Sequence, residues 1–128
     1  MEGKIVFDLT GNETADRAYK FYDVAKDSCA SYGAQVVTIR SKEENKVIYD
    51  WVSKGEGVSM WIGLERPAKE GNEWVWADGT KPAYTNWQKD YPKHSISPAY
   101  SCALLLYNRE WVDTSCWDRK RIVCEFNV

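Results

Sequence analysis

Four cysteines are the side chains of this 128-residue sequence that can form covalent bonds with one another: Cys29, Cys102, Cys116 and Cys124. They contain no Cys-x-x-Cys pair, and the sequence has a single histidine, His94. A zinc site needs closely spaced ligands of these types, so the pattern argues against one. An even number of cysteines instead predicts two disulfides and an oxidising compartment, with reduced structural thiols as the alternative.

The sequence contains no recognisable catalytic motif. The sequence has one histidine, no candidate nucleophile beside a recognisable base, no glycine-rich loop for phosphate and no motif that pairs two carboxylates. We therefore predict that the chain is not an enzyme.

Length and charge limit the remaining classes. We expect one domain over residues 1–128, because a chain of this length buries roughly two thirds of its unfolded surface. A net charge of -2 and a pI near 5.5 argue against nucleic acid as a partner. The basic run Arg119-Lys120-Arg121 is expected to be a solvated turn.

Processing and membrane signals are weak. No stretch approaches the roughly 20 apolar residues of a membrane span, and no signal peptide precedes Lys4. We interpret Met1 as the start of a mature domain. Asn12-Glu13-Thr14 matches an N-glycosylation sequon and supports secretion only weakly.

The first half of the sequence predicts a strand, a helix, a second strand and a second helix, in that order. Lys4 to Leu9 alternates as a strand, and Gln35 to Ile39 is expected to be a short buried strand. Between them, one helix face carries Ala18, Tyr22, Ala25 and Cys29, and Gly33 ends that helix.

A second helix is expected to begin at Ser41. Ser41 and Glu44 have the spacing of a capping box. The predicted buried face of this helix consists of Val47, Ile48, Trp51 and Val52.

The second half predicts short strands and no helices. The strands are expected at Trp61 to Leu64, Glu73 to Trp76, Cys102 to Leu106, Glu110 to Asp113 and Arg121 to Phe126. Between Trp76 and Cys102 lies a long stretch with few periodic apolar positions, and loops of that length are often functional. Its aromatics are expected to form a small core of their own: Tyr84, Trp87, Tyr91 and Tyr100.

The tryptophans divide into two predicted groups. Trp51, Trp61, Trp74 and Trp76 are expected in the core. For Trp87 and Trp111, a core position and a binding position both stay open.

These residues together resemble the C-type lectin-like domains. Trp61-Ile62-Gly63-Leu64 resembles the central-strand signature of that family, and Trp76-Ala77-Asp78-Gly79 followed by Asn86-Trp87 resembles the start of its long loop. Trp111-Val112-Asp113 before Cys116 resembles its late strand, and Tyr22, Ala25 and Cys29 match its first helix. The resemblance extends from about Tyr19 to Phe126.

The resemblance implies an α+β fold with two helices packed on small antiparallel sheets, a long irregular loop and two disulfides. By analogy Cys29 pairs with Cys124, and Cys102 pairs with Cys116. The extra N-terminal cysteine pair of the family is absent, which makes this the short form.

The family also implies calcium-dependent sugar binding, and here the residues disagree. Tyr91-Pro92-Lys93 stands where sugar-binding members carry Glu-Pro-Asn or Gln-Pro-Asp, and Tyr100-Ser101 stands where they carry an acidic residue. Trp111-Val112-Asp113 replaces Trp-Asn-Asp, so only Asp113 remains. Calcium needs six to eight oxygen ligands, and we therefore predict no metal and no cofactor.

Two features of this region carry further expectations. Asp113 is either a solvated or turn-stabilising carboxylate, or the partner of Lys93 standing in for the ion. The Tyr91-Pro92 bond aligns with a family position that is cis, and we expect cis to be retained.

We predict a recognition module that binds an extracellular protein or glycan, without calcium, through the long-loop face. The predicted ligand-binding residues are Asp90, Tyr91, Lys93, His94, Tyr100, Tyr107 and Asp113. His94 has the alternative of a plain exposed loop residue. A calcium-dependent lectin that uses non-standard ligands such as Asp90 stays the alternative function. The chain is expected to be extracellular, as a secreted protein or as a receptor ectodomain, and a monomer and a homodimer both stay open.

Overall fold

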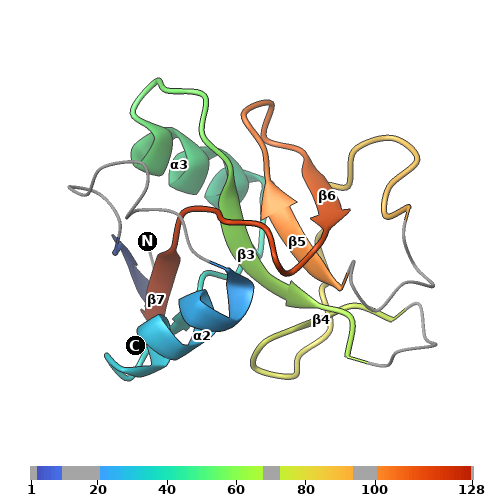
Figure 1. Cartoon of the computed structure of the whole chain (residues 1–128). Helices are drawn as coiled ribbons and strands as arrows, with labels where there is room; N and C mark the ends of the chain where they lie inside the picture. Colours follow the sequence, from blue (N-terminus) through green and yellow to red (C-terminus); the bar gives the residue numbers. More distant parts are fainter. Residues whose placement is uncertain (1–2, 10–20, 68–72, 94–100, 128) are drawn as a thin grey trace.

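The computed structural model describes residues 3–9, 21–67, 73–93 and 101–127, which fold into two small antiparallel sheets flanked by two helices (Figure 1). In chain order the elements are β1 (Lys4–Asp8), α2 (Tyr22–Ala30), β2 (Gln35–Val36), α3 (Lys42–Ser53), β3 (Met60–Glu65), β4 (Val75–Trp76), β5 (Cys102–Leu105), β6 (Trp111–Thr114) and β7 (Val123–Asn127). The predicted α+β class is therefore confirmed. None of the helices in these ranges is long and apolar enough to cross a membrane.

The first sheet has the strand order β1-β7-β2. Its central strand β7 pairs antiparallel with β1 from Lys4 opposite Asn127 to Asp8 opposite Val123. The first and last strands are thus neighbours, and the two ends of the chain lie on the same side of the molecule (Figure 1).

The second sheet has the strand order β4-β3-β5-β6. From Met60 to Leu64, β3 is buried at every position, because it lies in the interior of the sheet and contributes side chains to two core clusters. Met60, Ile62 and Leu64 belong to the cluster that contains residues of α3, and Trp61 belongs to the cluster that contains residues of α2. The hairpin of β5 and β6 aligns Ala103 with Asp113 and Leu105 with Trp111. The turn of this hairpin is closed by a bond from the Leu106 N–H to the Glu110 carbonyl, 2.9 Å.

Gly63 is the point where the two sheets approach each other. Its N–H donates to the Val37 carbonyl at 2.8 Å. A Cβ atom added at Gly63 would lie 2.7 Å from the Val36 carbonyl oxygen, closer than side-chain carbons approach. Glycine in the Trp61-Ile62-Gly63-Leu64 sequence is therefore required by backbone approach rather than by a turn.

Helix α2 packs as predicted. Tyr22, Ala25 and Cys29 are its buried residues, and Gly33 follows it with a left-handed φ of 73°. Position 18, the first residue of the predicted face, lies outside the described residues.

Helix α3 begins as predicted, with the Ser41 side chain accepting from the Glu44 N–H at 3.1 Å. The Glu44 carboxylate accepts from the Arg40 N–H at 3.0 Å, one residue before the position that a standard capping box uses.

The buried face of α3 differs from the prediction. Ile48 and Val52 are buried, but Val47 and Trp51 are 52% and 49% exposed, so their assignment to the core was wrong. The buried stripe instead consists of Asn45, Ile48, Tyr49, Val52 and Ser53. The helix is turned toward the side of Asn45 because that amide bonds to the backbone and side chains of the β5–β6 hairpin, as described below.

Both predicted disulfides are confirmed. Cys29 and Cys124 join α2 to β7 with a Cα–Cα distance of 5.6 Å. Cys102 and Cys116 join the start of β5 to the segment after β6 with a Cα–Cα distance of 5.3 Å.

The basic run at residues 119–121 is only partly a solvated turn. Arg119 is exposed, and its guanidinium lies 5.2 Å from the ring centre of Phe21. The Arg121 side chain is 13% exposed and forms an ion pair with Asp8 at 2.9 Å. The prediction was wrong for Arg121, because β1 and β7 bring these two oppositely charged side chains together.

Candidate functional site

Trp111 anchors the described part of the long loop to β6. Its N–H donates to the Asn86 carbonyl at 2.9 Å, and its carbonyl accepts from the Gln88 N–H at 2.8 Å. The rings of Trp76, Tyr84 and Trp87 stand edge-on to the Trp111 ring, at centroid distances of 5.8, 5.7 and 5.9 Å. Trp111 is fully buried, and Tyr84 and Trp87 pack against the main hydrophobic core that contains it. The prediction that the loop aromatics form a core of their own was therefore wrong for these two residues. The Tyr91 ring lies against the Lys93 ammonium instead, and Tyr100 lies outside the described residues.

Asp113 and Lys93 lie in contact, but not as two side-chain charges. The Asp113 carboxylate is 4% exposed and accepts the main-chain N–H of Lys93 at 2.9 Å. The Lys93 ammonium lies 4.8 Å from the ring centre of Tyr91. The solvated interpretation of Asp113 is thus wrong, and the carboxylate stabilises the loop through its backbone.

The Tyr91-Pro92 bond is cis, as expected. Before it, Asp90 is exposed and has a left-handed φ of 69°, while Tyr91 is half-buried. The loop therefore brings Asp90, Tyr91 and Lys93 next to β6, where the Asp113 carboxylate is buried.

Tyr107 does not belong to this group. It is 72% exposed and lies in the β5–β6 turn, whereas Asp113 pairs with Ala103 toward the other end of the hairpin. At about 3.3 Å per strand residue, the two positions are separated by roughly 10 Å or more. His94 and Tyr100 lie outside the described residues.

A metal centre is not formed by the described residues. Within residues 3–9, 21–67, 73–93 and 101–127, no group of three or more histidine, cysteine or acidic side chains could hold a metal ion.

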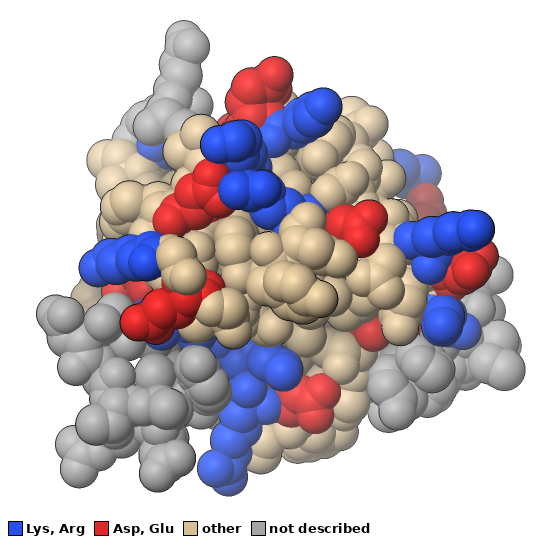
Figure 2. All heavy atoms as spheres, turned by 90° about the horizontal axis from the view of Figure 1, so that it is seen from above, with Lys and Arg blue, Asp and Glu red and all other residues tan. Residues whose placement is uncertain are grey.

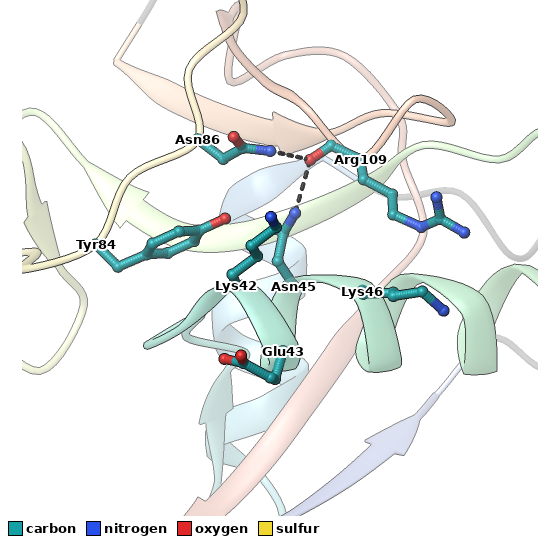
Figure 3. A pocket seen from close by; sticks show the side chains of 7 residues that line it. All are labelled: Lys42, Glu43, Asn45, Lys46, Tyr84, Asn86 and Arg109. Atoms are coloured by element: carbon teal, nitrogen blue, oxygen red, sulfur yellow. Dashed lines mark hydrogen bonds between the residues drawn. The ribbon is translucent and has the colours of Figure 1, made fainter.

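A second feature, which sequence reasoning missed, is a cleft of about 600 Å³ between α3, the long loop and the β5–β6 turn (Figure 3). Its lining residues are Lys42, Glu43, Asn45, Lys46, Tyr84, Asn86 and Arg109. The signal that could have identified it is Asn45, a polar residue in register with the apolar residues Ile48, Tyr49 and Val52.

Two amides on the carbonyl of Arg109 form the back of the cleft (Figure 3). Asn45 and Asn86 both donate to this oxygen from Nδ2, at 2.7 and 2.6 Å. Asn45 also accepts the buried Trp111 Nε1–H at 2.8 Å. Arg109 has a left-handed φ of 65°, which turns its carbonyl toward both amides. The cleft is therefore built by three segments that are distant in sequence.

The charges at one end of the cleft are paired with Asp50. Arg109 donates to Asp50 Oδ1 from Nε at 2.9 Å and from Nη2 at 2.7 Å, and Lys46 donates to Oδ2 at 3.1 Å. The bond from Arg109, followed by that from Lys46, lowers the pKa of Asp50. Burial, with a smaller contribution from the charge of Glu43, raises the pKa of Tyr84, so its hydroxyl stays a neutral donor at physiological pH.

Comparison with curated proteins gives relatives over most of the chain. Human tetranectin is 30% identical over 114 residues, which cover 85% of this chain and 56% of tetranectin. The chain thus spans about half the length of that relative. Rheacalcin-2 from Rhea americana is 30% identical over 120 residues, covering 81% of this chain and 80% of that protein.

Solved structures of C-type lectin domains and related proteins are also similar to this chain. The human scavenger receptor C-type lectin carbohydrate-recognition domain is 29% identical, with a TM-score of 0.82 and coverage of 100% of this chain and 94% of that chain. A calcium-independent type II antifreeze protein shares the fold at 22% identity, with a TM-score of 0.82 over 99% of this chain and 88% of that chain. The family model of the Lectin C-type domain matches residues 19–126. The chain therefore belongs to the C-type lectin domain family.

Proposed function

We propose that this chain is a single extracellular recognition domain over residues 1–128 that binds a protein or glycan through its long-loop face without calcium. Members of this family are non-catalytic recognition modules, in agreement with the lack of any enzyme motif in the sequence. The observation that carries the proposal is the contact between Asp113 and the Lys93 N–H.

This contact uses the one acidic residue that remains from the calcium motifs. A carboxylate that accepts a main-chain N–H at 2.9 Å and is 4% exposed already has a partner within the protein. The ammonium of Lys93 on the adjacent tyrosine ring adds a positive charge to the same surface. A divalent cation there would be repelled by that charge and would lack most of its oxygen ligands.

The surface around Lys93 has the composition of a binding face. Tyr91 offers a half-buried ring, and Asp90 and Lys93 offer exposed charges of opposite sign on either side of it. Tyrosine gives large contact area at low entropic cost, and interface energy is usually concentrated in a few such residues.

The proposed location is extracellular, as a secreted protein or as the outer part of a receptor. Two disulfides account for all four cysteines, and such bonds persist in oxidising compartments.

A second candidate function is calcium-dependent sugar binding. It is favoured by the 29% identity to a carbohydrate-recognition domain, and Asp90 supplies an exposed carboxylate on the loop. A glycan array and a pull-down from extracellular fluid, each run with calcium and then with a chelator, separate the two candidates. We expect the same bound species in both conditions. Binding that disappears with chelator would establish the second candidate instead.

Thermal stability gives an independent test. A ligand at a hundred times its dissociation constant stabilises by about 2.7 kcal/mol. We therefore expect the same melting temperature with millimolar calcium and with chelator, and a clear rise with calcium would contradict the proposal.

The binding face is tested by Tyr91→Ala combined with Lys93→Ala. We expect ligand binding to weaken by at least about 2 kcal/mol while the melting temperature moves little. The matched control is Tyr32→Ala combined with Lys26→Ala, which removes the same side-chain types at and near α2. If the folded Tyr91→Ala, Lys93→Ala variant binds its ligand normally, the functional surface lies elsewhere on the protein.

A further inference from the structure

Lys42 presents a positive charge to the cleft between α3 and the β5–β6 turn. It is the first residue of α3 and is exposed. In Figure 3 its side chain projects from the helix on the side of Tyr84 and the two amides. Within the described parts of the chain, no hydrogen bond or ion pair engages its ammonium.

The other cations of the cleft are already paired. Lys46 and the guanidinium of Arg109 extend toward the opposite end in Figure 3, where both contact Asp50. Glu43 extends from the other edge of the helix, away from the two amides. The side of the cleft next to Tyr84 therefore has Lys42 as its cation.

The polar groups beside Lys42 are held in place before any ligand arrives. The Tyr84 ring packs edge-on against Trp111, with centroids 5.7 Å apart. Asn45 and Asn86 are both fixed on the Arg109 carbonyl. Groups that need no reordering lose less entropy on binding, so this arrangement favours a small ligand.

We propose that this cleft is a second binding site, distinct from the surface formed by Asp90, Tyr91 and Lys93, for a sugar residue that carries one negative charge. Lys42 would hold the anionic group, a carboxylate or a sulfate ester. The Tyr84 hydroxyl and the Asn86 amide would contact ring hydroxyls. A volume of about 600 Å³ lies within the range of small-molecule sites.

The charge of the ligand is limited by the surroundings. Figure 2 shows positive and negative side chains interspersed over the face above α3 and the β5–β6 turn, without an extended field of one sign in its coloured part. Glu43 lies at the cleft and acts electrostatically on Tyr84. A single anionic group therefore fits the site better than a polyanion, which would also be repelled by Glu43.

Titration followed by amide NMR tests the proposal. The probes are glucuronate and galactose 6-sulfate, with glucose, galactose and inorganic sulfate as controls. We expect at least one charged sugar to shift the backbone amide of Lys42 and the side-chain amide of Asn86, and the two probes separate the carboxylate from the sulfate ester. Equal shifts from the neutral sugars or from inorganic sulfate, or no shifts at these residues, would overturn the proposal.

Three charge variants make the test residue-specific. Lys42→Gln should weaken binding of the active probe about tenfold, as expected for a lost charge-assisted hydrogen bond. Lys54→Gln removes the same charge at the other end of α3 and should leave binding unchanged. Glu43→Gln should tighten binding about twofold, because it removes a nearby negative charge. If Lys42→Gln and Lys54→Gln lower the affinity for the active probe equally, the effect is a general one of charge and the proposed site is wrong.

Discussion

Two lysines on different sides of the first turn of α3 have opposite environments. Lys4 is 5% exposed, and its ammonium contacts Glu44 at 2.8 Å, Glu125 at 3.2 Å and the Thr38 carbonyl at 2.7 Å. Lys42 is exposed at the edge of the cleft. The same side chain is thus part of the interior in one region and is available to a ligand in the other.

The difference follows from what burial demands of a charge. A buried ammonium must have its hydrogen-bonding partners within the protein, because the cost of removing it from water is several kcal/mol. Glu125, which is 1% exposed, also accepts from the Thr38 N–H at 2.6 Å and from its hydroxyl at 2.8 Å. The Lys4 region is therefore a closed network, and we expect its loss to affect folding rather than binding.

Lys4→Met gives the largest expected effect. It leaves the carboxylate of Glu125 buried without its cation, and breaking a buried pair in this way costs about 3–5 kcal/mol of unfolding free energy. Urea denaturation with the disulfides intact measures the change. The matched control, Lys42→Met, should stay within about 0.5 kcal/mol of the parent protein. Similar losses in both variants would remove the distinction between the two regions.

Gly63→Ala tests the close packing of β3 against the backbone of Val36 and Val37, the residues directly before the Lys4 partner Thr38. The added Cβ would meet the Val36 carbonyl oxygen at 2.7 Å, and a backbone atom cannot move aside as a flexible side chain does. We expect a loss of about 3 kcal/mol in the same denaturation experiment. Gly57→Ala is the control, since nothing lies within 4 Å of a Cβ at that position. A neutral Gly63→Ala would mean that the two sheets separate there at little cost.

Asn45→Ala tests the back of the cleft. The change removes the acceptor of the buried Trp111 Nε1–H and one donor to the Arg109 carbonyl. An unsatisfied buried donor costs about 2 kcal/mol. The side-chain amide resonances of Asn86 should shift as well, because that group shares the same carbonyl. A loss of stability without such a shift would show that Asn86 is positioned independently.

The smallest expected effect is the pH dependence of Asp50. Bonds from Arg109 and then Lys46 lower its pKa below 3.8, so its stabilising contribution is present above that pH and is lost as the pH falls through the folded-state value. Carboxyl NMR titration should give a midpoint below 3.8, and Arg109→Gln should raise it more than Lys46→Gln does. An unchanged midpoint in Arg109→Gln would show that the ion pair is not maintained in solution.

Local patterns predicted much of the fold. The helix face of Tyr22, Ala25 and Cys29 has the regular spacing that burial requires, and the structure agrees. The cysteine pairs followed from the family resemblance and not from spacing, since four cysteines allow three pairings.

The failures occurred where distant segments meet. Val47 and Trp51 are apolar at helical spacing, yet the hydrogen bonds of Asn45 with Arg109 and Trp111 place another stripe of α3 inside. The cleft was missed for the same reason, because Lys42, Tyr84 and Arg109 are far apart in the sequence.

The sequence by itself determined the family and the fold class, because these depend on residue types and on their order along the chain. Only the tertiary structure decided that Asp113 bonds to the Lys93 backbone, that Lys4 is buried while Lys42 is exposed, and that a cleft exists beside α3. Each of these depends on which residues, far apart in the sequence, lie next to one another in the fold. These neighbours decide whether a polar group can be buried, because a group removed from water at a high cost in free energy needs a hydrogen-bond partner within the protein.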